Sequence, residues 1–264
     1  HIIYNAMMAT LNPDDEVIIP APFWVSYPDI VLLAEGKPVI VECPESQNFK
    51  ITANQLEKNI TEKTKWLMLN SPSNPTGAVY STSELKELAE VLLKYPQVLI
   101  MSDDIYEKII YDNLEFSTLA SIEPKLKERC LTLNGVSKAY CMTGWRLGYC
   151  GASKEIIAAM NKMQSQSNTS TSSISMAAAV EALEGSQEFI KDHNEAFVRR
   201  RDMVVSSLNQ IEGINCLTPE GAFYVYPSCK GVIGKQTPDG NKISNDEDFM
   251  NYLLESEGIA GVHG

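Results

Sequence analysis

The feature that most constrains the fold is a series of short apolar runs, separated by segments with helical spacing. Each run is bounded by turn-forming residues and is apolar on both faces, which is typical of parallel strands covered on both sides. The runs occupy residues 16–20, 38–42, 65–70, 98–103 and 130–135. Since strands alternate with helices, we predict an α/β fold in which a mostly parallel sheet is sandwiched by helices.

Helical segments are expected between these strands. Ser81 and Glu84 have the spacing of a capping box, and Leu85, Leu88 and Leu92 follow at helical intervals. A helix is also expected over residues 2–11, and further apolar stripes with helical spacing occupy residues 156–160 and 177–183.

The character of the sequence changes after about residue 187. A long charged helix is expected over residues 188–211, and it is followed by short strands at 214–217 and 222–227 and by a helix from about Asp246. We therefore predict a large domain over 1–190. An interdomain helix and part of a small α+β domain follow over 191–264. The chain starts inside an expected helix and stops after an apolar run, so we expect both ends, including part of the large domain, to be missing.

Charge and cysteine usage narrow the function classes. The formal net charge is −12, which disfavours nucleic acid and anionic membranes as partners. No apolar run reaches the roughly 18 residues that a membrane helix needs. The six cysteines form no C-x-x-C pair and lie away from paired histidines, so we expect free thiols in a reducing compartment, a cytoplasmic location and no metal site.

Residues 70–77, NSPSNPTG, form a loop that directly follows an expected strand. Two prolines among serine, asparagine and glycine indicate a rigid loop, and open α/β sheets bind ligands at the carboxyl ends of their strands. Asn74 would offer its amide to a ligand oxygen, and the Asn74–Pro75 bond is a candidate for the cis form. The alternative is a purely structural turn.

Residues 102–106, SDDIY, end another strand with two adjacent carboxyl groups. Buried carboxylates are costly unless something pairs with them, and successive strand residues point to opposite faces. Asp103 and Asp104 should therefore have different partners, one of them a buried cation, with the Tyr106 phenol nearby. A solvated loop is the alternative.

Residues 134–149, NGVSKAYCMTGWRLGY, place Ser137 and Lys138 in a loop, with Arg146 eight residues after the lysine. A lysine among apolar and small residues can lose its charge, and a neutral amine is the nucleophile that forms an imine with an aldehyde. Arginine offers a planar fork that suits a phosphate. A surface lysine and a structural arginine are the alternative.

Residues 20–29, PAPFWVSYPD, place Trp24 and Tyr27 just after a strand. Their rings could pack in the core, which is the usual case, or stack on a flat ligand.

Taken in order, these four segments resemble the class I aminotransferases, with the bacterial aspartate aminotransferases nearest. The resemblance runs from His1 to Gly264, and GAFYVYP at 221–227 is a later landmark. It implies the fold of pyridoxal-phosphate (PLP) transferases, with PLP as the cofactor and amino acids and 2-oxo acids as substrates. It also implies a homodimer whose active sites lie at the subunit interface.

The resemblance assigns three residues to the cofactor ring. Lys138 would form the Schiff base with PLP and carry the proton between the substrate and the cofactor. Asp103 would pair with the pyridine nitrogen, and Trp24 would stack on the ring.

It assigns four more residues to the oxygen atoms of the cofactor. Tyr106 and Asn74 would hydrogen-bond the phenolic oxygen, while Arg146 would bind the phosphate with Ser137 close to it. Trp24 and Asn74 would also contact the substrate.

Three functions remain open. The leading hypothesis is an aminotransferase of amino-acid biosynthesis that converts aspartate and 2-oxoglutarate to oxaloacetate and glutamate. The second is an aminotransferase for aromatic amino acids or prephenate. The third is an inactive fragment that retains only the fold. It arises because the family's Gly-rich phosphate-binding stretch, its arginine for the substrate carboxylate and a tyrosine donated by the partner subunit all fall outside this sequence.

Overall fold

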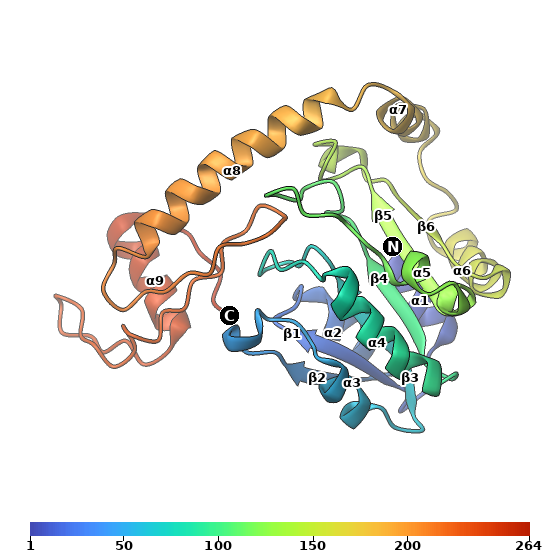
Figure 1. Ribbon diagram of the computed structural model, residues 1–264, viewed down its shortest axis with the longest axis horizontal. Helices are drawn as coiled ribbons and strands as arrows, with labels where there is room; N and C mark the ends of the chain where they lie inside the picture. Colours follow the sequence, from blue (N-terminus) through green and yellow to red (C-terminus); the bar gives the residue numbers. More distant parts are fainter. The chain divides into compact units, whose positions relative to one another are not determined.

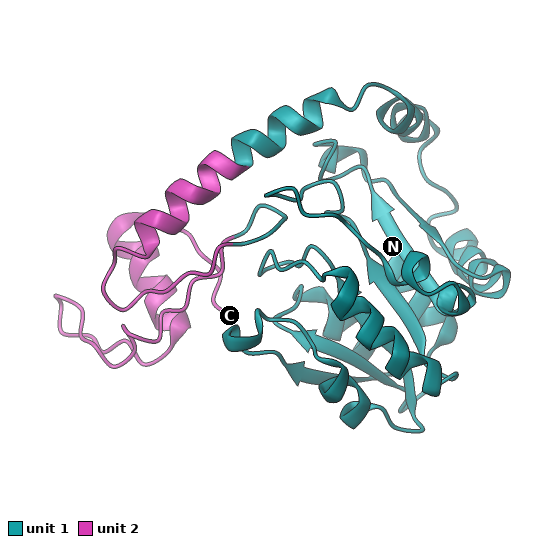
Figure 2. Ribbon diagram, viewed as in Figure 1, with its two compact units in different colours: residues 1–197, 219–224 teal, residues 198–218, 225–264 magenta.

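The computed structural model describes all residues from His1 to Gly264. They form two compact units, one of residues 1–197 and 219–224 and the other of 198–218 and 225–264 (Figure 2). The change of unit falls within helix α8 (Glu188–Leu208). The sequence places it a few residues earlier, at 190, and the division into a large and a small domain stays a prediction.

A six-stranded sheet forms the centre of the first unit (Figure 1). Its strands lie in the order β2-β1-β3-β4-β5-β6, and all neighbours are parallel except β5 and β6. The strands are β1 (Glu16–Ala21), β2 (Lys37–Glu42), β3 (Thr64–Asn70), β4 (Leu99–Asp103), β5 (Cys130–Gly135) and β6 (Gly148–Gly151). All five strands expected for the sheet are confirmed, and so is the mostly parallel α/β fold.

Strand β6 is not predicted from the sequence, because two of its four residues are glycines and it has no apolar run. It is antiparallel to β5, with Asn134 opposite Tyr149 and Gly135 opposite Gly148. The connection 136–147 therefore leaves and re-enters the sheet at the same edge, and it carries both Lys138 and Arg146.

Two apolar layers cover the two faces of the sheet. Successive strand residues alternate between them: Leu67 packs in one layer, and Trp66 and Met68 pack in the other. One layer contains α3 (Ala53–Asn59), α4 (Thr82–Lys94), α5 (Leu119–Ile122) and the 3₁₀ helix η2 (Pro124–Arg129). The other contains α1 (Ile2–Thr10), α2 (Ser26–Leu33) and α6 (Lys154–Ser167). Figure 1 shows α4 in front of the strands and α1 and α2 behind them.

Helix α4 begins as the sequence predicts. The Ser81 hydroxyl accepts a hydrogen bond from the Glu84 amide, and the Glu84 carboxylate accepts one from the Ser81 amide. Leu85, Leu88 and Leu92 are buried on one face of the helix. The remaining helices are α7 (Ser173–Glu184), α9 (Asp246–Glu257) and the 3₁₀ helices η1 (Glu45–Gln47) and η3 (Thr143–Trp145). No helix is long and apolar enough to span a membrane.

The strands expected at 214–217 and 222–227 are wrong. Asn215 forms only an isolated bridge, with Ser228, and no residue of 222–227 pairs in a ladder, although Gly221 just before it forms an isolated bridge with Ile110. Ala222 has φ of 57°, which breaks an extended conformation, and Pro227 lacks the amide that a ladder needs.

Candidate active site

The predicted site residues gather where the central strands end. Asn70 and Asp103 are the last residues of β3 and β4, and they lie opposite each other in the parallel register. β5 lies beside β4 and ends at Gly135, so the loop that carries Lys138 starts at the same edge. This is the edge where open α/β sheets place their ligands.

Asp103 is a buried carboxyl group with well-defined partners. Its side chain is 6% exposed. One oxygen accepts a hydrogen bond of 2.6 Å from the Tyr27 hydroxyl, and the other accepts one of 3.3 Å from the Ile105 amide. Burial raises the pKa of Asp103 to about 6, while these two donors and the Lys138 charge lower it. The carboxyl is therefore held in place and can change charge near neutral pH.

Asp104 points elsewhere, as expected from the strand geometry. Its carboxylate accepts a hydrogen bond of 2.7 Å from Ser102, whose hydroxyl lies 3.1 Å from that of Thr118. The residue is 2% exposed, and burial raises its pKa to about 7. Because both aspartates are buried and have different partners, the alternative of a solvated loop is wrong.

Lys138 lies between two aromatic rings. Its Nζ is 5.5 Å from the centre of the Tyr106 ring and 5.7 Å from the centre of the Phe223 ring. The side chain is half-buried and makes no hydrogen bond or ion pair, and its charge lowers the pKa of Asp103. The structure thus brings Lys138, Asp103 and Tyr106 together and leaves the amine free to react.

Tyr106 is buried, and its hydroxyl lies 2.5 Å from the hydroxyl of Tyr224. Burial, followed by the contact with Tyr224, raises the pKa of Tyr106. Phe223 and Tyr224 belong to a segment that served only as a landmark in the sequence. Neither could be assigned to the site beforehand, because the contact joins residues more than a hundred positions apart.

Trp24 is not a core residue, so that alternative is wrong. Its side chain is 37% exposed, and its ring meets the Tyr27 ring edge-on, with centroids 5.5 Å apart. An exposed indole at the end of β1 is free to cover a ligand. Tyr27, the other aromatic residue of PAPFWVSYPD, is buried and contacts both Trp24 and Asp103, and the family resemblance assigns it no role.

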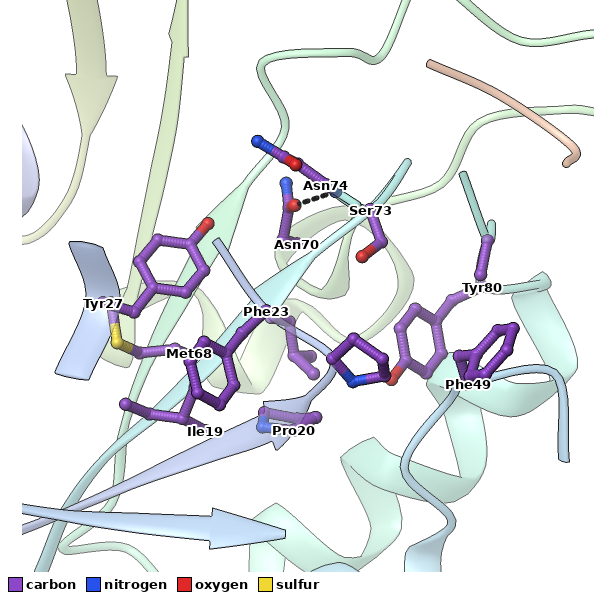
Figure 3. Close-up of a pocket in the computed structure, with 13 residues that line it drawn as sticks. Ile19, Pro20, Phe23, Tyr27, Phe49, Met68, Asn70, Ser73, Asn74 and Tyr80 are labelled. Atoms are coloured by element: carbon purple, nitrogen blue, oxygen red, sulfur yellow. Dashed lines mark hydrogen bonds between the residues drawn. The ribbon is translucent and has the colours of Figure 1, made fainter. Parts of the chain in front are cut away.

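Asn74 lies in a loop that is fixed to the strand ends. Its amide N–H donates a hydrogen bond of 2.7 Å to the Asn70 side chain, which in turn donates one of 2.9 Å to the Asp103 carbonyl. The side-chain amide of Asn74 makes no hydrogen bond and borders a pocket with Tyr27 (Figure 3). The Asn74–Pro75 bond is cis, as expected.

Arg146 and Ser137 are less closely tied to the other candidates. Arg146 is exposed, has φ of 52°, and donates a hydrogen bond of 2.8 Å to the Thr143 carbonyl. The guanidinium is close enough to the backbone nitrogen of His1 to act on it electrostatically, so Arg146 lies near the start of α1. No hydrogen bond or ion pair joins Arg146 or Ser137 to Lys138.

Comparison with known proteins identifies the family. The family model for aminotransferases of class I and II matches residues 1–264, so the chain belongs to that family. It is 58% identical to the aspartate/prephenate aminotransferase of Cereibacter sphaeroides and 55% identical to an aspartate aminotransferase of Rhizobium meliloti. These alignments cover all of this chain but only 66% and 64% of the two relatives.

Solved structures agree with this assignment. The crystal structure of the aspartate aminotransferase from Rhizobium meliloti superposes with a TM-score of 0.96 at 55% identity, over 98% of this chain and 65% of that one. The aspartate aminotransferase from Thermus thermophilus with maleate gives 0.88 at 38% identity, over 99% and 65%. The expected PLP-transferase fold is confirmed, and the chain spans about two thirds of the length of its relatives.

Proposed function

We propose that this chain forms the cofactor-binding part of a PLP-dependent aminotransferase. The observation that carries the proposal is the meeting of the buried Asp103 carboxyl, the Lys138 amine and the Tyr106 phenol at one edge of the sheet. The family membership and the names of the similar proteins support it.

PLP, the cofactor of aminotransferases of this type, fits the groups that this edge offers. The free amine of Lys138 suits its aldehyde, and the buried carboxyl of Asp103 suits a protonated ring nitrogen. The Tyr106 phenol and the Asn74 amide suit its phenolic oxygen, while the Trp24 indole is exposed enough to cover the ring.

Each protein group then has a defined task. PLP, when bound, acts as an electron sink for the substrate carbon that loses a proton. Asp103 keeps a proton at the ring nitrogen, because removing one partner of a buried charge pair costs about 3–5 kcal/mol. Lys138 anchors the cofactor and then takes up and returns a proton at its Nζ.

The phosphate would lie at the start of α1. Arg146 supplies a guanidinium there, and the first amides of a helix favour anions. Ser137 lies in the same connection and would add a hydroxyl.

For the substrates we propose aspartate and 2-oxoglutarate, with oxaloacetate and glutamate as products. The names of the relatives from Cereibacter sphaeroides and Rhizobium meliloti support aspartate. Prephenate is a second candidate acceptor because the first of these relatives carries it in its name. An aromatic amino acid is less supported, since the aromatic aminotransferase from Pyrococcus horikoshii is only 34% identical.

Steady-state assays on the full chain would separate these substrates. Aspartate, glutamate, tyrosine and phenylalanine would be offered as donors, and 2-oxoglutarate and prephenate as acceptors. The proposal expects the highest kcat/KM for aspartate with 2-oxoglutarate. Turnover with none of these donors would favour the hypothesis of an inactive protein that retains only the fold.

We also propose that the protein works as a homodimer. Large apolar side chains are exposed on two helices of the first unit, Val25, Leu32 and Leu33 at α2 and Ile174, Met176 and Val180 on α7. Exposed apolar groups of this kind favour a protein partner. A sedimentation mass of one chain would contradict the dimer. A cytoplasmic location and the absence of a nucleic-acid partner stay predictions.

A further inference from the structure

Tyr27 lies where two of the proposed cofactor contacts meet. It belongs to the first turn of α2, three residues after Trp24 in the same segment, and its side chain is only 3% exposed. It packs in the apolar layer that covers one face of the sheet. Its hydroxyl leaves that layer toward Asp103, and its ring faces Trp24.

The hydroxyl makes the shorter of the two hydrogen bonds to the Asp103 carboxyl. That bond is 2.6 Å long, compared with 3.3 Å for the Ile105 amide. Burial and the neighbouring Asp103 raise the pKa of Tyr27 well above its usual value, so the phenol keeps its proton and donates it in the hydrogen bond to Asp103. Tyr27 therefore favours the charged form of Asp103 and fixes the direction of one carboxylate oxygen.

The ring of Tyr27 makes the second contact. It meets the Trp24 indole edge-on, at 89° between the ring planes. Edge-to-face pairs of this kind are favourable because the positive edge of one ring faces the negative face of the other. Since Trp24 is partly exposed, this contact restrains an indole that would otherwise be free to rotate.

We propose that Tyr27 is a positioning residue that holds the Asp103 carboxyl through its hydroxyl and the Trp24 ring through its own ring. The inference rests on the proposed function, because both residues are taken to contact PLP. Tyr27 would thus align the Asp103 carboxyl, which pairs with the ring nitrogen of the cofactor, with the Trp24 indole, which covers the ring.

Four charged or titratable groups around Asp103 can influence its pKa. They are Tyr27 from α2, Lys138 from the connection 136–147, and Asp104 and Tyr106 from its own segment. Tyr27 donates to the carboxylate, and the Lys138 charge favours it. Replacing the hydroxyl removes the closest of these stabilising contacts, so protonation of Asp103 should begin at a higher pH.

The test compares three variants. Tyr27→Phe removes the hydroxyl and keeps the ring, and Tyr27→Leu removes both. Tyr80→Phe is the matched control, because Tyr80 is also buried and lines the same pocket, while its hydroxyl accepts only from the Ile51 amide (Figure 3). PLP affinity is measured by titration of each cofactor-free full chain between pH 5 and 9.

We expect Tyr27→Phe to bind PLP about 10- to 100-fold more weakly at pH 7, in line with the loss of one hydrogen bond to a charged group. The pH below which binding weakens should rise by about one unit. Tyr27→Leu should lose further affinity, and adding Trp24→Phe should then change it little, because the indole is already unrestrained. Tyr80→Phe should bind PLP as the wild type does at every pH. Any change in affinity that comes from titration of the PLP phosphate should be the same in both proteins.

Two results would overturn the inference: a pH profile of Tyr27→Phe that coincides with those of wild type and Tyr80→Phe, or equal affinities for the Phe and Leu variants. Failure of the proposed function looks different. In that case the wild-type protein itself would not bind PLP, or Lys138→Ala would leave binding unchanged.

Discussion

Replacing Asp103 by asparagine should separate stability from function. The carboxyl is buried, and its pKa rises from 3.8 to about 6 on folding. A folded-state pKa above the unfolded value means that ionisation opposes folding at high pH. The shift of about two units corresponds to roughly 3 kcal/mol, which is the stability that the cofactor-free protein gives up above pH 6 to keep this group charged.

The substituted side chain would avoid that loss, because an amide has no charge to bury and can still accept a hydrogen bond from Tyr27. We expect Asp103→Asn to stabilise the cofactor-free protein by up to about 3 kcal/mol at pH 7.5. The gain should shrink as the pH falls from 7 to 5, since wild-type Asp103 then becomes protonated in the folded state. Urea denaturation at several pH values measures both the gain and its pH dependence.

The same substitution should remove most of the activity. An amide cannot keep a proton on the ring nitrogen, and losing a buried charge partner costs about 3–5 kcal/mol. If that loss falls on the transition state, kcat drops by about 10²- to 10⁴-fold. Near-normal turnover, or a variant that is less stable at every pH, would refute the reasoning.

Three other substitutions extend the test. Asp104→Asn should also stabilise the cofactor-free protein above pH 7, because burial raises the pKa of Asp104 to about 7. Transamination should persist in this variant. Loss of activity would mean that the two aspartates share one task. Lys138→Ala should abolish the absorption above roughly 350 nm that PLP shows when bound through an amine, and an unchanged spectrum would reject the assignment. Ser81→Ala should lower the free energy of unfolding by about 1 kcal/mol, measured by thermal or urea denaturation, without changing kcat. An unchanged free energy of unfolding would show that the Ser81 cap does not stabilise α4.

The sheet could be predicted because its strands are buried and carry their own signal. Residues 65–70 are apolar on both faces, and they form β3 with both faces covered. β6 was missed because a Gly-rich strand of four residues has no hydrophobic pattern. Helix α3 was also missed, although Thr52 and Gln55 form a capping box that the sequence displays. At 222–227 the β-forming side chains suggested a strand. No strand forms there, because the positive φ of Ala222 and the missing amide hydrogen of Pro227 interrupt the extended backbone.

The candidate site was predicted only in part. The strand ends and the rigid loop follow from local patterns, so Asn74, Lys138 and the pair Asp103 and Asp104 could be proposed from their segments, while the choice of Asp103 came from the family resemblance. Tyr27 and Tyr224 could not, because their roles depend on tertiary contacts with Asp103 and Tyr106. The position of Arg146 also depends on tertiary structure, since seven residues that include the 3₁₀ helix η3 separate it from Lys138.

The most direct test of the central claim is to locate the covalent attachment of the cofactor. The full chain would be incubated with PLP, reduced with borohydride to make the linkage permanent, digested, and analysed by mass spectrometry. The geometry predicts one modified lysine, Lys138, because its amine is free and lies within the electrostatic influence of the Asp103 carboxyl. Label on a different lysine, or no label after reduction, would contradict the claim.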